Sequence, residues 1–71
     1  MSVYPNKIKD YRKAAGLTQW QLAEQLGTSQ ARLWQWEAGV TPVRFVHRQR
    51  IAEILKVNIE AIWNDTGAIK Q

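Results

Sequence analysis

Apolar side chains recur three or four residues apart along this chain, between turn-forming residues that follow one another at short intervals. The turn-forming residues are Pro5, Gly16, Gly27, Gly39, Pro42 and Gly67. A spacing of three and four places side chains on one face of a helix, and no stretch alternates in period two for long enough to form a sheet. We therefore predict an all-α fold, with a frayed tail after Gly67. Its five short helices are expected at residues 6–15, 19–26, 30–37, 43–55 and 59–64.

Length and composition limit the classes of protein that this chain can belong to. Its 71 residues are expected to form a single domain over residues 1–71, with an ordered core at about 5–65. The absence of cysteine excludes disulfides and thiolate metal sites, and it favours a reducing compartment. No apolar run is longer than three residues, so no membrane span is expected. The net charge of +4 favours a polyanionic partner.

The most informative segment covers residues 18–39, where two predicted helices are joined by a three-residue turn. Ala23 is small enough to let two helix axes approach, and Gly27 takes the left-handed backbone of a first turn residue without a steric penalty. The side chains expected to fill the angle between these helices are Leu22, Leu26, Leu33 and Trp36. The residues placed to cap the helices that follow them are Thr18, Ser29 and Asn58. This pattern predicts a helix-turn-helix, and an ordinary helical hairpin without a ligand is the alternative.

The predicted helix at residues 30–37 has two faces of different composition. Trp34 and Trp36 point roughly 200° apart on a helix, so only one of them can join the apolar face with Leu33. The opposite face carries Gln30, Ala31, Trp34 and Gln35. Glutamine can pair with the N6/N7 edge of adenine, and alanine can pack on a thymine methyl. We expect Trp36 in the core, and Trp34 either against thymine methyls and sugars or folded over Leu26 or an arginine stem. A solvated helix surface is the alternative interpretation of the glutamines.

The stretch LTQWQLAEQLGTSQARLWQWEAG, residues 17–39, resembles the helix-turn-helix of the Cro and repressor proteins of lambdoid phages. A looser match extends over residues 8–63. The resemblance implies a compact, five-helix domain of the lambda-repressor type that binds operator DNA as a dimer, with its third helix in the major groove. It further implies that Gln19 contacts a phosphate, and that Arg12 and Glu37 form a salt bridge between the first and third helices. The chain departs from this family at Trp34, where relatives usually carry a polar residue.

Two groups of residues are assigned to DNA contact. Those expected to read bases are Gln30, Ala31, Trp34 and Gln35. Those expected to contact the DNA backbone are Thr18, Gln19, Ser29, Arg32 and Arg44. Further positive charge lies near the first and fourth predicted helices, at Lys7, Lys9, Lys13, Arg48 and Arg50. Because phosphate contacts hold the protein in place and base contacts give specificity, the two groups are expected to play different roles.

A homodimer is expected because one reading helix covers about half an operator, and two copies can enter successive major grooves roughly 34 Å apart. The apolar residues assigned to the interface are Val40, Phe45, Val46 and Trp63, since a core of this size is not expected to hide all of them. Arg44 would lie at the rim of this interface and hold a phosphate. The operator is therefore expected to be an inverted repeat.

No residue pattern in this sequence indicates catalysis. We predict no enzyme activity, cofactor, metal or small-molecule ligand, because glycine-rich phosphate loops, nucleophile–base pairs and metal-ligand clusters are missing. His47, the only histidine, is expected at the surface or in an interface. The sequence thus predicts a Cro-like transcriptional repressor that binds double-stranded DNA. Its expected location is the cytoplasm of a bacterial host, where it is associated with the nucleoid when bound to DNA. The alternatives are an antitoxin-type helix-turn-helix protein that acts through a protein partner, and a DNA-binding subunit whose effector domain is on another chain.

Overall fold

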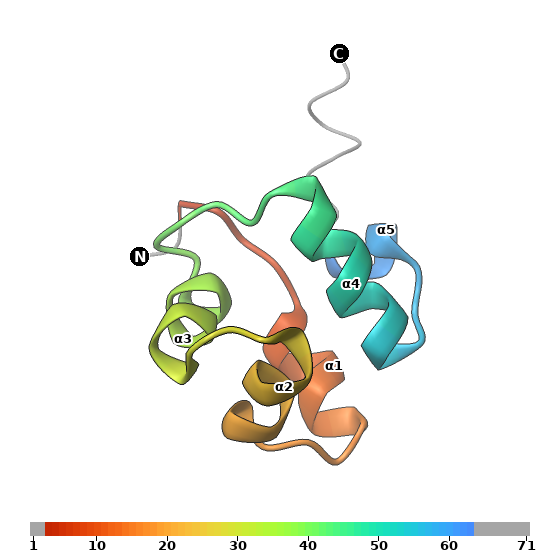
Figure 1. Ribbon diagram of the computed structural model, residues 1–71. Helices are drawn as coiled ribbons and strands as arrows, with labels where there is room; N and C mark the ends of the chain where they lie inside the picture. The colour runs from red at the N-terminus through yellow and green to blue at the C-terminus, as the bar shows by residue number, and fades with distance from the viewer. Residues whose placement is uncertain (1–2, 64–71) are drawn as a thin grey trace.

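The computed structural model describes residues 3–63, and within this range it contains five α-helices and no strand (Figure 1). The helices are α1 (Ile8–Ala14), α2 (Gln19–Leu26), α3 (Gln30–Ala38), α4 (Phe45–Leu55) and α5 (Ile59–Ile62). The all-α prediction is confirmed, because every predicted helix is present with ends that differ by at most two residues. The predicted tail after Gly67 lies outside the described residues.

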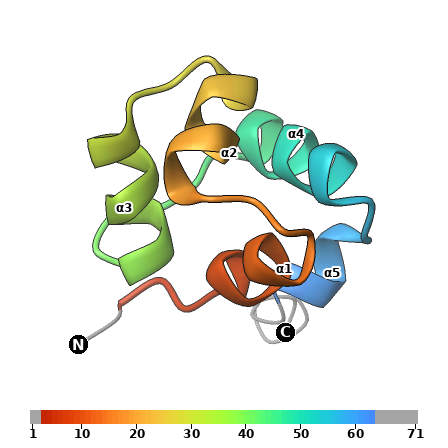
Figure 2. The ribbon, with the colours of Figure 1, turned by 90° about the horizontal axis from the view of Figure 1, so that it is seen from below.

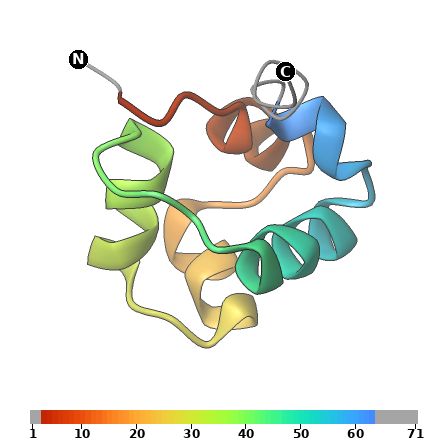
Figure 3. The same ribbon diagram turned by 90° about the horizontal axis from the view of Figure 1, so that it is seen from above.

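The five helices surround a single core to which each of them contributes. In Figures 1 and 2, α2 and α3 form an angled pair and α4 packs against α2, and in Figures 2 and 3 α1 lies beside α5. The start of α1 is joined to the end of α5 by the Lys7 amide, which donates to the Ile62 carbonyl at 2.9 Å. The buried core residues are Ile8, Leu22, Ala23, Leu33, Trp36, Val43, Ile51, Ala52, Leu55, Ile62 and Trp63. The side chains predicted to fill the angle between α2 and α3 are among them, except Leu26, which is partly buried against this core.

Local signals set the ends of α2 and α3. Thr18 accepts a hydrogen bond from the Gln21 amide and the Gln21 side chain accepts one from the Thr18 amide, which makes a reciprocal cap at the start of α2. Ser29 accepts from the Arg32 amide at the start of α3. Gly27 ends α2 in the left-handed conformation, with φ of 71°, as the sequence predicts. The turn between the two helices is therefore specified by residues within it.

The predicted side-chain cap at Asn58 is wrong. Asn58 precedes α5, but its side chain makes no capping hydrogen bond. The helix has only four residues, and the Ala61 amide in its first turn already bonds to the Asn58 carbonyl at 3.0 Å. The backbone of Asn58 therefore accepts the bond that its side chain was expected to accept.

Trp63 was assigned to the dimer interface, and the structure corrects this. Its side chain is only 2% exposed and belongs to the core. The guanidinium carbon of Arg48, on α4, lies 5.0 Å from the centre of the Trp63 ring. The core holds two of the four tryptophans, Trp36 and Trp63, and α5, which directly precedes Trp63, packs against α4. Trp63, directly after α5, therefore belongs to the core of one chain rather than to an exposed apolar surface.

The N-terminal segment is fastened to the end of α3, which the sequence did not predict. The amides of Val3 and Tyr4 both donate to the Gly39 carbonyl at 3.0 Å. The Asn6 side chain donates to the Trp36 carbonyl at 2.7 Å and accepts from the Ile8 amide at 3.0 Å. Seen from above, the segment runs from the end of α3 to α1, while the α3–α4 connection runs separately towards α4 (Figure 3). One asparagine therefore joins the start of α1 to the end of α3.

Candidate functional site

Helix α3 has one buried face and one exposed face, as predicted. Leu33 is fully buried and Trp36 is 4% exposed, whereas Trp34 is 55% exposed. The other residues that the sequence assigned to base reading, Gln30, Ala31 and Gln35, are exposed as well. The predictions of a core Trp36 and an exposed Trp34 are confirmed. The exposed face is therefore a surface that offers two amides, a methyl group and an indole.

A nearly buried ion pair holds α3 against α1. The Arg12 Nε atom lies 2.6 Å from Glu37 Oε2, and Arg12 Nη2 donates to Glu37 Oε1 at 3.2 Å. The two side chains are only 9% and 4% exposed, and Arg12 Nη1 also donates to the Leu17 carbonyl at 2.9 Å. The pairing that the resemblance implied is thus present. Its two-point geometry fixes the rotation of α3 as well as its distance from α1.

Gln19 connects this ion pair to the start of α3. Its Nε2 donates to Glu37 Oε1 at 3.1 Å, and its Oε1 accepts from Gln30 Nε2 at 3.3 Å. A carboxylate can only accept, so Glu37 determines which end of the Gln19 amide faces it. The oxygen of that amide must then face Gln30. As a result, Gln30 keeps its own oxygen and one N–H for an outside partner, which is the acceptor–donor pair that adenine requires.

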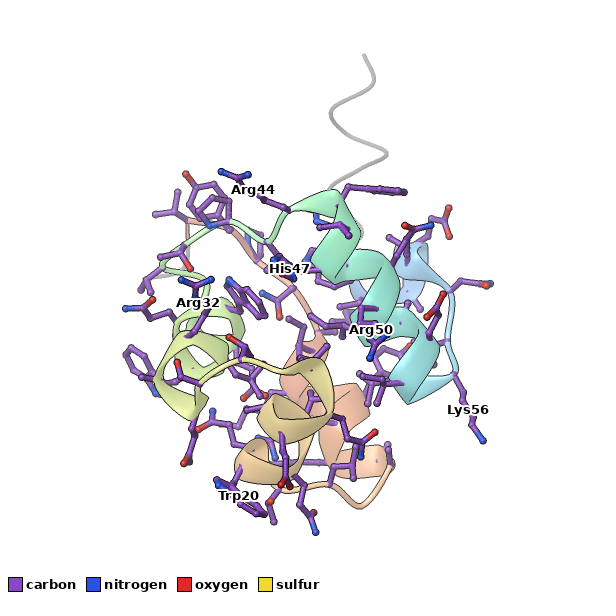
Figure 4. All side chains as sticks on the ribbon, viewed as in Figure 1. Trp20, Arg32, Arg44, His47, Arg50 and Lys56 are labelled. Carbon is purple, nitrogen blue, oxygen red and sulfur yellow. The ribbon has the colours of Figure 1, made fainter. Side chains whose placement is uncertain are left out.

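The first turn of α2 lies beside this network and carries an exposed tryptophan. The cap at Thr18 uses the Gln21 amide, and helix geometry leaves the amides of Gln19 and Trp20 without an acceptor inside the helix. Trp20 is 58% exposed, and Figure 4 shows it at the start of α2, pointing away from the core. Sequence reasoning missed Trp20. The available signal was its position outside the apolar stripe of Leu22 and Leu26.

On its other side, α3 borders a basic pocket of about 420 Å³. The pocket is lined by Arg32, Gln35, Trp36, Thr41, Pro42, Arg44 and His47. Arg44 precedes α4 without a side-chain cap, and Figure 4 shows Arg32, Arg44 and His47 around the space between α3 and the start of α4. Thr41 Oγ1 is buried and has no hydrogen-bond partner among residues 3–63. Two guanidinium groups, an available hydroxyl and the uncapped start of a helix form a setting for an anion.

His47 is half-buried and packs against the core. Its ring centre lies 5.0 Å from that of Trp36, with the two rings tilted by 38°. The expectation of a surface or interface position therefore holds only for the edge that lines the basic pocket.

The remaining residues assigned to the dimer interface are exposed. Val40 is 47% exposed, and Phe45 and Val46 are each 64% exposed. Val40 follows the end of α3, whereas Phe45 and Val46 form the first turn of α4. Val3 and Tyr4 add two more exposed apolar side chains. Their amides bond to the carbonyl of Gly39, the residue directly before Val40. Five of the seven exposed large apolar side chains among the described residues therefore belong to the N-terminal segment, the residue after Gly39 and the first turn of α4.

Residues 3–63 contain no group of three histidine, cysteine, aspartate or glutamate side chains that can hold a metal ion. None of the five helices has the length and apolar character needed to cross a bilayer.

The comparisons with known proteins agree with this geometry. A sequence model of the helix-turn-helix family matches residues 8–62. A crystal structure from Bacteroides fragilis, described as that of a DNA-binding protein, superposes with a TM-score of 0.77 and 26% identity over 82% of this chain and 94% of that one. The master regulator for biofilm formation SinR, solved in complex with DNA, gives a TM-score of 0.70 and 27% identity over 76% of this chain and 87% of its own. No curated protein matches the sequence.

Proposed function

Because this chain belongs to the helix-turn-helix family, we propose that it is a DNA-binding transcription regulator, and more specifically a Cro-like repressor that occupies its operator as a homodimer. The observation that carries the proposal is the division of α3 into a buried face at Leu33 and Trp36 and an exposed face with two amides. The DNA complex of SinR, a structural neighbour of this chain, supports double-stranded DNA as the partner. Binding to DNA, rather than catalysis, is the proposed activity.

In the proposed complex, the exposed face of α3 lies in the major groove. Gln30 and Gln35 pair with adenines, Ala31 packs on a thymine methyl, and Trp34 lies at the edge of the same surface. The bond from Gln30 to Gln19 supports this assignment, because it orients the Gln30 amide before DNA arrives. An oriented side chain loses less conformational freedom on binding.

The DNA backbone is held on both sides of α3. Thr18, Gln19 and Ser29 lie at the starts of α2 and α3, where helix N-termini favour phosphate. Arg32 and Arg44 line the basic pocket on the other side. The net charge of +4 attracts the protein to DNA over a longer range.

Two copies are proposed to associate through Val40, Phe45 and Val46. A standard protein–protein interface buries about 800 Å² of accessible surface on each partner. Three exposed apolar side chains supply much less than this area, so the dimer is expected to be weak without DNA. Two-fold symmetry of the protein then requires an inverted-repeat operator, with half-sites roughly 34 Å apart between centres.

Selection of binding sites from a random DNA pool tests the proposal. We expect an inverted repeat, and we expect Gln30→Ala and Gln35→Ala each to lose about 1–3 kcal/mol of discrimination at one or two base pairs. Gln25→Ala is the matched control, because Gln25 is an exposed glutamine that points roughly 200° away from Ala23 on α2. If the pool yields no preferred sequence, or if both α3 variants keep the preference of the wild type, α3 is not the reader.

The antitoxin-type alternative rests on Phe45 and Val46, each 64% exposed, which a protein partner can cover as well as a second copy can. Sedimentation of the purified protein with operator DNA distinguishes the two. We expect two chains per full operator site, and we expect Phe45→Glu to weaken both dimer formation and operator binding. Gln49→Glu, at an exposed position further along α4, is the control for added charge. One chain per full site at undiminished affinity contradicts the dimer.

A further inference from the structure

Trp20 is an exposed aromatic residue outside the reading face, by which we mean the exposed face of α3 with Gln30, Ala31, Trp34 and Gln35. It is 58% exposed and is the second residue of α2. The residues of α2 that enter the core are Leu22 and Ala23, with Leu26 partly buried. Trp20 precedes Ala23 by three residues and Gln25 by five, so on the surface of α2 it lies closer to Ala23 than to Gln25.

The position of Trp20 next to Gln19 connects it with α3. Gln19 bonds to Glu37 and Gln30, which both belong to α3. Gln19 and Trp34 line the same hollow of about 320 Å³, together with Lys9 of α1. One side of the reading face therefore carries the indole of Trp34 and the amide of Gln19, and Trp20 follows Gln19 directly in the chain.

We propose that Trp20 contacts the sugar–phosphate backbone on the α2 side of the major groove, where its indole N–H donates to a phosphate oxygen and its ring packs on a deoxyribose. This inference rests on the proposed function, and it adds a backbone contact that the sequence analysis did not include. With Gln19 and Trp34, Trp20 forms what we call the aromatic flank. The hollow that Gln19 and Trp34 line lies on the side of α3 opposite the basic pocket.

The chemistry around Trp20 favours a phosphate-bearing partner. The first turn of α2 has no acidic residue, and the positive end of the helix dipole lies there. The amides of Gln19 and Trp20 lack acceptors inside the helix, so they can bond to the same oxygen atoms as the indole N–H. Lys9, which lines the neighbouring hollow, adds a positive charge. An indole suits this position because it combines an apolar face for sugar carbons with a single donor.

Fluorescence quenching tests the location of Trp20 directly. Of the four tryptophans, Trp36 and Trp63 are buried, so in Trp34→Phe the exposed indole is that of Trp20. We expect the selected operator DNA to lower acrylamide quenching of the Trp34→Phe protein. The same measurement on Trp20→Phe reports Trp34 and serves as the matched comparison. Unchanged quenching in Trp34→Phe, when operator binding is complete, overturns the inference and leaves the proposed function standing.

Binding measurements supply the second test. Trp20→Ala is expected to weaken binding about three- to tenfold on operator and unrelated DNA alike, because a backbone contact carries no sequence information. The salt dependence of binding should stay as in the wild type, since no charge is removed. Trp20→Phe keeps an aromatic ring and loses the N–H donor, so its affinity for DNA should lie between those of the wild type and Trp20→Ala. Wild-type affinity in Trp20→Ala overturns the inference, whereas failure of the wild type to bind any DNA overturns the proposed function.

Discussion

The two sides of α3 differ in chemistry and in how firmly their side chains are held. On the α2 side, Gln19 is bonded to both Glu37 and Gln30, and the exposed groups on α2 and α3 are neutral amides and indoles, with the single charge of Lys9 from α1 beside them. On the α4 side, Arg32 and Arg44 line an open pocket, and neither has an acidic partner among residues 3–63. One side is thus bonded within the protein before any ligand arrives, and the other keeps its charges available.

This difference suggests a division of work within the proposed complex. Neutral, oriented groups determine register, because hydrogen bonds depend steeply on distance and angle. Charges without an acidic partner inside the protein provide attraction that acts over several ångströms and is screened by salt. The α2 side is therefore expected to determine where the protein binds, and the α4 side how tightly it binds at a given ionic strength.

The largest effect is expected from breaking the α2-side network at its centre. Glu37→Ala removes the partner of a guanidinium that is only 9% exposed, and Gln19 loses its acceptor at the same time. An uncompensated buried charge is expensive, so we expect a loss of about 3 kcal/mol in the free energy of unfolding, measured in urea. Glu24→Ala, at an exposed position on α2, is the matched control. A loss below about 1 kcal/mol would show that the ion pair does not hold α3 in place.

The second effect concerns the α4 side and appears in the salt dependence of binding. The double variant Arg32→Ala, Arg44→Ala is expected to lower the slope of log affinity against log salt concentration by about 2, one unit for each lost phosphate contact. Stability should hardly change, because both side chains are exposed. Trp20→Ala is the contrasting variant, with weaker binding at an unchanged slope. Equal slopes in the double variant and the wild type would refute the assignment of charge to the α4 side.

The third effect is a loss of specificity without a loss of fold. Gln19→Ala removes the acceptor that orients Gln30, while Arg12 and Glu37 keep each other. We expect discrimination at the base pair read by Gln30 to fall by about 1 kcal/mol, with little change at the pair read by Gln35. Competition binding with operators altered at one pair at a time measures both. An equal loss at both pairs would mean that Gln19 acts on the whole helix rather than on Gln30.

The sequence predicted the helices and the two faces of α3, because these follow from residues close together in the chain. Thr18 and Ser29 cap the helices directly after them, and Leu33 and Trp36 share a face through helical spacing alone. The pairing of Arg12 with Glu37 joins residues that are far apart, and only the resemblance to a family implied it.

Features that depend on packing between distant segments were not predictable from local patterns. Trp63 is buried where α5 packs against α4, and its identity as a tryptophan fits a core and an interface equally well. The double role of Asn6 depends on where α3 ends relative to α1. Gln19 was expected at a phosphate, but its bonds to Glu37 and Gln30 require the finished angle between α2 and α3.

The smallest effect concerns Thr41, whose buried Oγ1 has no hydrogen-bond partner in the described part of the chain. Thr41 on the α4 side thus contrasts with Gln19 on the α2 side, whose side-chain nitrogen and oxygen both make hydrogen bonds inside the protein. Thr41→Val replaces the hydroxyl by a methyl group of similar shape. Since an unpaired buried hydroxyl costs free energy, we expect the stability of the free protein to stay the same or rise by up to about 1 kcal/mol in thermal unfolding.

If the basic pocket holds a phosphate, the same variant should bind operator about two- to threefold more weakly, because the phosphate loses one donor. Thr28→Val, in the turn between α2 and α3, is the control for the exchange itself. A clear loss of stability in Thr41→Val would mean that the hydroxyl already has a partner in solution, and the α4 side would then be as fully bonded as the α2 side.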